Sequence, residues 1–225
     1  MFLWRKNTLL PTAGKRVIFI IGGSGVLGSA FAAKKPDDVF IINVSRRGSI
    51  SGENTLNLHQ DVLHDPEKTI RQIAEMVESV DVLITMAYDH HFSSIEKLDR
   101  NRFLREIELD TFSPMQMSML CAKRFWSKND REMNREKGRK VIHISSGAAF
   151  GKSSRPELAS YSGAKAALTI MTEYLHDYLS ANFGVSAHIV APGALRDADT
   201  KEKTVAALWE LQALASDMFT LSNVF

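Results

Sequence analysis

The segment Tyr161-Ser162-Gly163-Ala164-Lys165 places a phenol and an ammonium group four residues apart. Residues with this spacing share one face of a helix, so the charge of Lys165 is expected to favour the phenolate form of Tyr161. A phenol tuned in this way can exchange a proton with a substrate near neutral pH. Upstream of Tyr161, Ser146 comes directly after Ser145 and adds a hydroxyl group. Together these side chains predict proton transfer to or from a carbonyl oxygen.

The elements that must position these side chains follow a regular pattern. Short runs rich in β-branched residues alternate with longer stretches of helical periodicity, which is typical of a parallel sheet covered by helices on both faces. Strands are expected at Arg16–Ile21, Val39–Val44, Thr55–Leu58, Val80–Thr85, Lys140–Ser145, Val185–Val190 and Leu221–Phe225. Helices are expected at Gly25–Lys34, Pro66–Ser79, Arg102–Lys128, Ala159–Asn182 and Lys201–Ser216. The charged segment Ser127–Lys140 is interpreted as a solvated helix end and loop.

Glycines gather where the first expected strand turns into the first helix. The sequence Gly22-Gly23-Ser24-Gly25-Val26-Leu27-Gly28 follows the apolar run Val17–Ile21. Such a turn needs positive φ angles and a close approach of the backbone, and the N–H groups at the start of the helix can bind a pyrophosphate. A strand-turn-helix without a ligand would also use glycine. The position in the first crossover unit nevertheless favours dinucleotide binding by these seven residues.

The end of the second expected strand bears on which dinucleotide is bound. A site for NAD would use an acidic residue there to bind the ribose hydroxyls. The chain instead has Ser45, Arg46 and Arg47, whereas Asp37 and Asp38 lie before the strand, at its wrong end. Two guanidinium groups and a hydroxyl can clamp a 2′-phosphate, although arginines after a strand can also be merely solvated. The sequence therefore favours NADP(H).

The order of these motifs resembles the short-chain dehydrogenase/reductase family from about Arg16 to Gly193. The matching positions are the glycine turn, Ser146, Tyr161, Lys165, Asp61 after the third strand, and Pro192-Gly193 after the sixth. The resemblance implies an α/β protein with a single Rossmann-type, doubly wound parallel sheet, helices on both faces and a shortened C-terminal region. We expect an N-terminal arm at residues 1–14 and one dinucleotide-binding and catalytic domain at residues 15–225. The resemblance also implies cofactor contacts from Asp61, Val62, Met86, Ala87, Tyr161, Lys165, Pro192 and Gly193.

The resemblance assigns roles to the reactive side chains. Tyr161 gives a proton to the substrate oxygen as the nicotinamide delivers hydride, and Ser146 polarises the carbonyl. Lys165 holds the nicotinamide ribose and tunes Tyr161. The catalytic asparagine of the family falls on Asp110, whose main-chain carbonyl would hold a water molecule leading to the lysine. Because Pro114 lacks the N–H that would bond to this carbonyl, we expect a kink at this point and count Asp110 as catalytic.

Two departures from the family pattern affect the substrate side. The family's Asn-Asn-Ala-Gly reads Thr85-Met86-Ala87-Tyr88, so an aromatic ring replaces a glycine at the cofactor cleft. Only a short segment follows Gly193, which predicts a short or missing lid and a pocket that is open or is completed by a partner subunit. A homodimer or homotetramer through the long helices is implied by the resemblance.

Composition excludes several classes of protein. The chain has 225 residues, 28 of them basic and 26 acidic, so its formal net charge of +2 gives no strong field for nucleic acid or an anionic membrane. The lone Cys121 rules out an internal disulfide and a cysteine-based zinc site, and it suits a reducing cytoplasm. No apolar run is long enough for a signal peptide or a membrane span. We therefore expect a cytoplasmic protein with no metal, nucleic-acid or membrane partner.

The sequence does not name the small carbonyl or alcohol substrate. Loops at the carboxyl ends of the expected strands offer Tyr88, His90, His91, Phe92, Phe150, Lys152, Arg155, Leu195 and Arg196 as lining residues. Two other classes remain open. An NADP(H)-binding sensor or scaffold without turnover is favoured by Asp110 and Tyr88. A sugar-nucleotide-type epimerase or dehydratase is favoured by the G-x-x-G-x-x-G spacing, but such enzymes carry a large C-terminal substrate domain that this chain is too short to contain.

Overall fold

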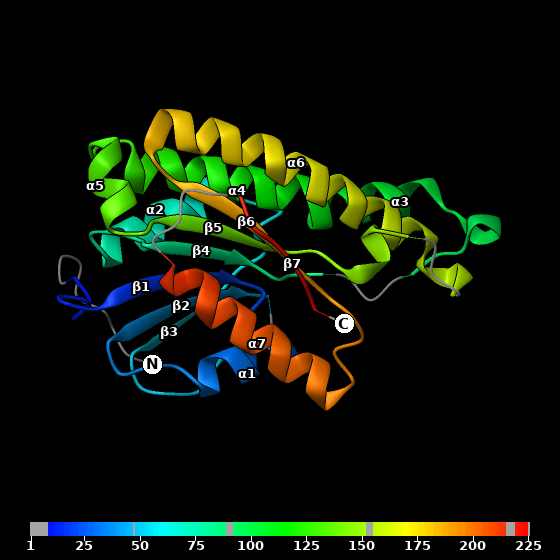
Figure 1. Ribbon diagram of the computed structural model, residues 1–225, viewed down its shortest axis with the longest axis horizontal. Coiled ribbons are helices and arrows are strands. Elements are labelled where there is room, and N and C mark those ends of the chain that lie inside the picture. Colours follow the sequence, from blue (N-terminus) through cyan, green and yellow to red (C-terminus); the bar gives the residue numbers. More distant parts are fainter. Residues whose placement is uncertain (1–8, 47, 89–91, 152–154, 215–218, 225) are drawn as a thin grey trace.

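The structure is a computed structural model, and it describes residues 9–46, 48–88, 92–151, 155–214 and 219–224. Within these ranges, seven strands form one sheet in the order β3-β2-β1-β4-β5-β6-β7, and all neighbouring strands are parallel (Figure 1). The strands are β1 (Arg16–Ile21), β2 (Val39–Ser45), β3 (Thr55–His59), β4 (Val82–Thr85), β5 (Lys140–Ile144), β6 (Ser186–Pro192) and β7 (Leu221–Val224). The strand order reverses between β1 and β4, where α/β proteins bind ligands at the carboxyl ends of the strands.

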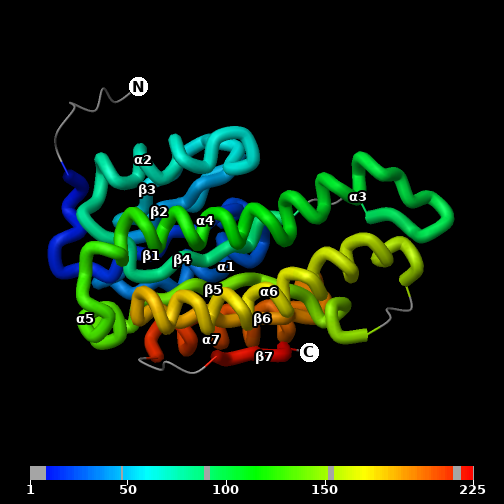
Figure 2. The backbone as a smooth tube through the Cα atoms, turned by 90° about the horizontal axis from the view of Figure 1, so that it is seen from above, coloured from blue at the N-terminus to red at the C-terminus, as the bar shows by residue number. Residues whose placement is uncertain are grey.

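Helices cover both faces of this sheet, which confirms the predicted doubly wound α/β fold (Figure 1). On one face lie α1 (Val26–Ala33) and α7 (Ala198–Ala213); on the other lie α2 (Pro66–Met76), α4 (Ser113–Cys121) and α6 (Ala159–Phe183). The helical run through α4 begins with α3 (Arg100–Ile107) and a π-helical turn, η2 (Glu108–Phe112), and ends with a second π turn, η3 (Ala122–Trp126). In Figure 2, α3 and the first turns of α6 project together beyond the sheet. In the described part of the chain, no helix has the length and apolar character needed to cross a membrane.

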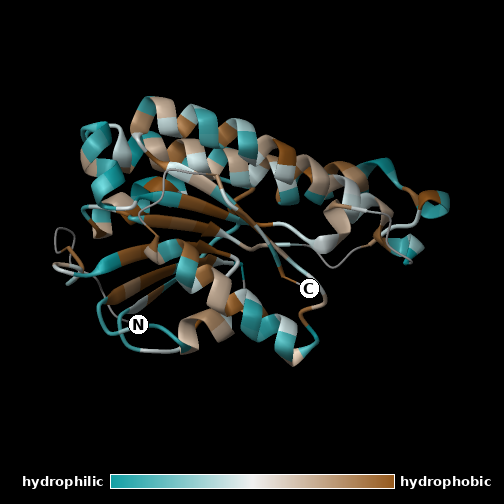
Figure 3. Cartoon of the chain, viewed as in Figure 1, coloured by the Kyte–Doolittle hydropathy of each residue, from teal (hydrophilic) through white to brown (hydrophobic). Residues whose placement is uncertain are grey.

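The residues of β1 show how the sheet separates two cores. Ile18 and Ile20 pack with Phe31 of α1 on one side, whereas Phe19 packs with Trp126 on the other. This alternation is the period of two of a β-strand, and all five side chains are completely buried. A strand covered on both faces therefore reads as a continuous apolar run, and Figure 3 shows these runs concentrated in the sheet. That is why the strands could be predicted from the sequence.

The charged segment Ser127–Lys140 differs from its prediction, because it contains a short helix, α5 (Arg131–Glu136). The carboxylate of Asp130 caps this helix by accepting a hydrogen bond from a backbone N–H in the first turn. A single buried side chain, Asn134, anchors the helix by donating to the carbonyl of Trp126 at 3.0 Å. With so small a buried face, α5 lacks the apolar periodicity by which helices are predicted.

The last residues of the predicted N-terminal arm pack against the sheet domain. Leu10 belongs to the core beside α2, and its N–H donates to the carbonyl of Met76 at 2.8 Å. Residues 9–14 therefore lie on the fold, and residues 1–8 are outside the described part of the chain.

Candidate active site

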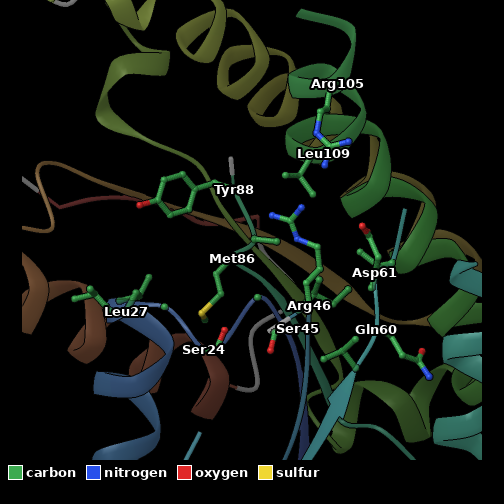
Figure 4. Close-up of a pocket in the computed structure, with 17 residues that line it drawn as sticks. Ser24, Leu27, Ser45, Arg46, Gln60, Asp61, Met86, Tyr88, Arg105 and Leu109 are labelled. Atoms are coloured by element: carbon green, nitrogen blue, oxygen red, sulfur yellow. The ribbon is translucent and has the colours of Figure 1, made fainter. Parts of the chain in front are cut away.

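A cavity of about 800 Å³ lies at the carboxyl ends of β1, β2 and β4 (Figure 4). Its walls come from the glycine-rich turn, from the segments that follow β2, β3 and β4, and from the helical run of α3 and η2. The predicted cofactor residues that line it are Gly22, Ser24, Gly25, Val26, Leu27, Ser45, Arg46, Asp61, Val62, Met86 and Ala87. Tyr88, predicted on the substrate side, also lines it, as do Ile21, Val44, Gln60, Arg105 and Leu109, which were not predicted.

Three glycines shape the turn in different ways. Gly22 has a φ of +82°, and a Cβ there would lie 2.5 Å from the backbone of Ala87. A Cβ at Gly28 would lie 2.1 Å from the carbonyl oxygen of Gly23, so Gly28 allows α1 to pack against the turn. A Cβ at Gly25 would meet only a carbonyl oxygen at 3.9 Å, and Gly25 borders the cavity. As the N-cap of α1, Gly25 leaves the N–H groups of the first turn beside the cavity, where an anion is favoured.

The turn is held in place by Asn43, a buried residue of β2 that was not predicted as a site residue. Its Oδ1 accepts a hydrogen bond from the N–H of Gly23 at 3.0 Å, and its Nδ2 donates to Oδ1 of Asn57 on β3 at 2.8 Å. A buried amide needs such partners because an unpaired polar group in a core is costly. The signal in the sequence was a polar residue inside the apolar run Val39–Val44.

The segment after β2 folds back against the glycine turn. The hydroxyl of Ser45 donates to the carbonyl of Gly48 at 2.6 Å, and a Cβ at Gly48 would lie 2.4 Å from the side chain of Ser24. Ser45 is therefore buried within this turn, whereas Arg46 is exposed at the cavity. Arg47, the other arginine of the predicted phosphate clamp, lies outside the described residues.

The buried amino group of Lys165 contacts two oxygen atoms. Its Nζ donates to the carbonyl of Ile144 at 3.0 Å and lies 3.2 Å from Oδ1 of Asp110. The side chains of Lys165 and Asp110 are only 4% and 0% exposed. The same Nζ lies 5.8 Å from the centre of the Tyr161 ring, one turn earlier on α6. Tyr161, Lys165 and Asp110 therefore come together, with the Asp110 side chain forming an ion pair with the lysine.

Asp110 lies in the π turn η2, which is where the sequence predicted a kink. The N–H of Ser113 bonds to the carbonyl of Glu108, five residues back, and Pro114 brings no N–H to the next turn. Such single widened turns are frequent at functional sites. The hydroxyl of Thr111 donates to a carbonyl of α6 at 2.8 Å, which fixes the turn beside Lys165. The predicted irregularity is therefore a widened turn in a run that stays helical through Ser113.

The two adjacent serines after β5 have different partners. Ser145 is buried, and its hydroxyl lies 2.8 Å from that of Thr169 and 3.1 Å from the carbonyl of Lys165. Ser146 is half-buried, and its Oγ accepts a bond from the N–H of Ala148 at 3.3 Å at the start of η4 (Gly147–Ala149), which packs against α6. Because Ser146 accepts in this contact, its O–H can still donate to a substrate oxygen.

Aromatic side chains lie close to the Tyr161 ring. Phe92 meets it edge to face, with ring centres 5.3 Å apart. The carbonyl of Ser93 accepts from both the N–H and the hydroxyl of Ser160, at 3.4 Å each, which joins the segment after β4 to the start of α6. Partial burial raises the pKa of Tyr88, and the nearby Tyr161 and Asp110 raise it further. Tyr88 therefore offers a neutral phenol at the edge of the cavity.

A buried histidine on β5, His143, joins the sheet to α4 near this cluster. Its Nδ1 lies 2.6 Å from the hydroxyl of Thr85 on β4, and its Nε2 lies 3.4 Å from that of Ser118. Burial, with a smaller effect of the Lys165 charge, lowers the pKa of His143 to about 3. The imidazole is therefore neutral at physiological pH. Its role was not predicted, since one histidine in an apolar strand carries no distinguishing pattern.

Tyr88 connects the cavity to the group formed by Tyr161, Lys165 and Asp110. It lines the cavity and lies close to Tyr161 and Asp110. Among the described residues, Ser146, Tyr161, Lys165 and Asp110 are not part of the cavity wall. Gly23 and Gly28 pack against each other within the glycine turn. Pro192 is the last residue of β6, and the N–H of Gly193 donates to the carbonyl of Val224 at 2.6 Å. Of the residues predicted to contact substrate, His90, His91 and Lys152 lie outside the described part of the chain.

The cavity has the features that a dinucleotide requires. At one end, the glycine turn and the N-terminus of α1 suit a pyrophosphate, and the space a Cβ at Gly25 would fill is open. Val62 and Leu109 offer apolar surface for a base, and Arg46 offers positive charge. The volume lies within the roughly 300–1,000 Å³ of typical ligand pockets. The residues present therefore fit such a cofactor.

Comparisons with known proteins identify a matching family model and solved structures with a similar fold. A family model for short chain dehydrogenases matches residues 16–209. A short chain dehydrogenase family protein from Francisella tularensis has a TM-score of 0.73 at 16% identity, over 93% of this chain and 97% of that chain. The ligand-free aldohexose dehydrogenase of Thermoplasma acidophilum has a TM-score of 0.77 at 17% identity, over 93% of this chain and 92% of that chain. The short chain dehydrogenase of Leptospira borgpetersenii with bound NAD+ has a TM-score of 0.76 at 15% identity, over 99% of this chain and 98% of that chain. No curated protein sequence matches the chain.

Proposed function

The chain belongs to the short-chain dehydrogenase family, and we propose that it is an NADP(H)-dependent oxidoreductase that interconverts a small carbonyl compound and its alcohol. The observation that carries this proposal is the contact of Lys165 with Asp110 and its closeness to the Tyr161 ring, beside a cavity that fits a dinucleotide. A bound nicotinamide would supply or accept the hydride.

The side chains provide the remaining parts of the reaction. In the reducing direction, the hydroxyl of Tyr161 gives its proton to the oxygen of the substrate. Ser146 donates a hydrogen bond to the same oxygen and so stabilises the negative charge that develops there. Lys165, held by Ile144 and Asp110, lies one helical turn from Tyr161 and would bind the ribose of the cofactor. Asp110 would act chiefly through its hold on Lys165.

The choice of NADP(H) rests on Arg46. This residue stands at the end of β2, where an enzyme specific for NAD would have an acidic residue, and its exposed guanidinium borders the cavity. NAD is the alternative cofactor, since the similar structure from Leptospira borgpetersenii was solved with bound NAD+.

A homodimer is the assembly we propose. Ile170, Tyr174 and Tyr178 are exposed at intervals of four residues on α6 and so form an apolar stripe along one face of this long helix. Self-association of two such faces would bury the stripe. A cytoplasmic location remains a prediction from the single cysteine.

A second candidate is an NADP(H)-binding sensor or scaffold without turnover, and the ring of Tyr88 at the cavity favours it. A cofactor titration followed by a screen of ketones and aldehydes separates the two functions. The enzyme should bind NADPH more tightly than NADH and oxidise it with at least one carbonyl compound. Binding without consumption across a broad panel would favour the sensor, and no binding of either coenzyme would reject both.

A further inference from the structure

The charged side chains of the cavity are unevenly distributed. Among its described lining residues, Arg46, Arg105 and Asp61 are charged, so cations outnumber the single carboxylate. Figure 4 shows Ser24 and Leu27 of the glycine turn on one side and Asp61 and Arg105 on the other. The end of the cavity away from the pyrophosphate position is therefore also suited to an anion.

Arg105 reaches this position because of its place on the helical run. It stands four residues before Leu109, so the two side chains share one face, and both line the cavity. Leu109 lies in the π turn η2, and Arg105 lies one turn farther out on α3, the helix that projects beyond the sheet. In Figure 4 the side chains of Arg105 and Arg46 are directed toward one another. They come from opposite walls, one from α3 and one from the segment after β2.

We propose that Arg105 and Arg46 together bind the 2′-phosphate of the adenosine half of NADP(H). The proposal rests on the proposed function and adds to it a residue that the family resemblance did not supply. Two guanidinium groups can each present paired N–H donors to one phosphate. The N-terminus of α1 would hold the pyrophosphate, so a second anion site on the adenosine side would correspond to an additional phosphate on the ribose. Arg105 would thus be a determinant of cofactor specificity.

The test uses nucleotides that lack the nicotinamide, so that binding is measured without turnover. The probes are 2′,5′-ADP and 5′-AMP, which differ only in the 2′-phosphate, and their dissociation constants are measured by titration calorimetry on the full chain. The wild-type protein should prefer 2′,5′-ADP. Arg105→Ala should lose roughly tenfold in affinity for it, the effect of one charge-assisted hydrogen bond, with little change for 5′-AMP. The affinity of Arg105→Lys for 2′,5′-ADP should lie between those of the wild type and Arg105→Ala, since lysine keeps the charge without the paired donors.

Arg102→Ala is the matched control, because Arg102 is an exposed arginine on the same helix that is not among the cavity-lining residues. It should bind both probes as the wild type does. If Arg105→Ala keeps the full preference for 2′,5′-ADP, or loses both probes equally, Arg105 does not bind the phosphate, and the proposed reaction is unaffected. If the wild-type protein shows no preference or binds neither probe, the phosphate site and the choice of NADP(H) are both overturned.

Discussion

Lys165 and Asp110 form an ion pair that is almost completely removed from solvent, with Nζ 3.2 Å from Oδ1. Lys165 lies on α6 and Asp110 in the π turn η2, so the pair joins the two longest helical runs on this face of the sheet. A buried charge without its partner is strongly destabilising, whereas a paired one is tolerated. The pair therefore fixes the ammonium near Tyr161 and makes the turn at Asp110 part of the site.

Removal of the Asp110 carboxylate tests this relationship through stability. Asp110→Ala removes the carboxylate partner of the Lys165 ammonium, and we expect a loss of roughly 3–5 kcal/mol in the free energy of unfolding. Asp110→Asn, which introduces the family's usual residue, should cost less because its amide oxygen can still accept a hydrogen bond. Urea denaturation measures both. An alanine variant as stable as the wild type would show that the ion pair does not hold this region together.

Acid should destabilise the fold through two buried histidines. Burial lowers the pKa of His143 and of His188 to about 3, with smaller effects of Lys165 on the first and of Lys140 and His176 on the second. The unfolded chain binds these protons near pH 6.5, so between pH 6.5 and 3 it holds more protons than the folded chain, and stability falls with falling pH. Each histidine should cost on the order of 2 kcal/mol by pH 5.

The contribution of His188 can be isolated by comparing urea unfolding at pH 7.5 and pH 5. Its Nε2 lies 2.8 Å from the hydroxyl of Ser186, a contact that glutamine can replace in part. We expect His188→Gln to show a smaller loss of stability on acidification than the wild type. His59→Gln, at an exposed position on β3, is the control and should keep the wild-type slope. Equal slopes for both variants would rule out His188 as a source of acid sensitivity.

The glycine turn offers a pair of substitutions that separates folding from binding. A Cβ at Gly28 would lie 2.1 Å from a backbone oxygen, so Gly28→Ala should destabilise the fold by several kcal/mol, roughly the cost of overpacking. A Cβ at Gly25 has room, so Gly25→Ala should melt as the wild type does. It should nevertheless bind NADPH at least about tenfold more weakly, because the added methyl group enters the pyrophosphate position. Normal binding by Gly25→Ala would move the cofactor away from this turn.

The apolar stripe on α6 predicts the state of association. Tyr174 is 74% exposed at the middle of this stripe, and a lysine there would place a charge inside a dimer interface. Tyr174→Lys should convert a dimer into a monomer in light scattering after size-exclusion chromatography. Met133→Lys, an exposed apolar position on α5, should leave the dimer intact. A wild-type protein that is already monomeric at micromolar concentration would contradict the proposed interface.

The sequence predicted the features that depend on local patterns. The strands could be predicted because a sheet covered on both faces needs continuous apolar runs, and the glycine turn because its backbone approaches Ala87 too closely for a side chain. The resemblance predicted that Asp110 lies near Lys165, but not that its side chain forms an ion pair with the lysine, since such a contact depends on tertiary packing. Arg105 was not predicted as a cavity residue, because a charged residue on an exposed helix usually faces solvent.

Pro114 illustrates the boundary between the two cases. The missing N–H predicted an irregular helix, but the sequence could not show that the run would widen into a π turn instead of bending. Asn43 is a comparable case, because its place in an apolar strand was visible, whereas its bonds to Gly23 and Asn57 required the assembled sheet.

The most direct test of the proposed reaction compares Tyr161→Phe with Tyr88→Phe, using NADPH consumption with an active carbonyl substrate and a separate measurement of NADPH binding. Tyr88 lines the cavity, whereas the centre of the Tyr161 ring lies 5.8 Å from the amino group of Lys165. We expect Tyr161→Phe to bind NADPH as the wild type does and to lose turnover by at least about a hundredfold, the typical size of general acid catalysis, while Tyr88→Phe remains active. Turnover that survives in Tyr161→Phe would contradict the proposed reaction.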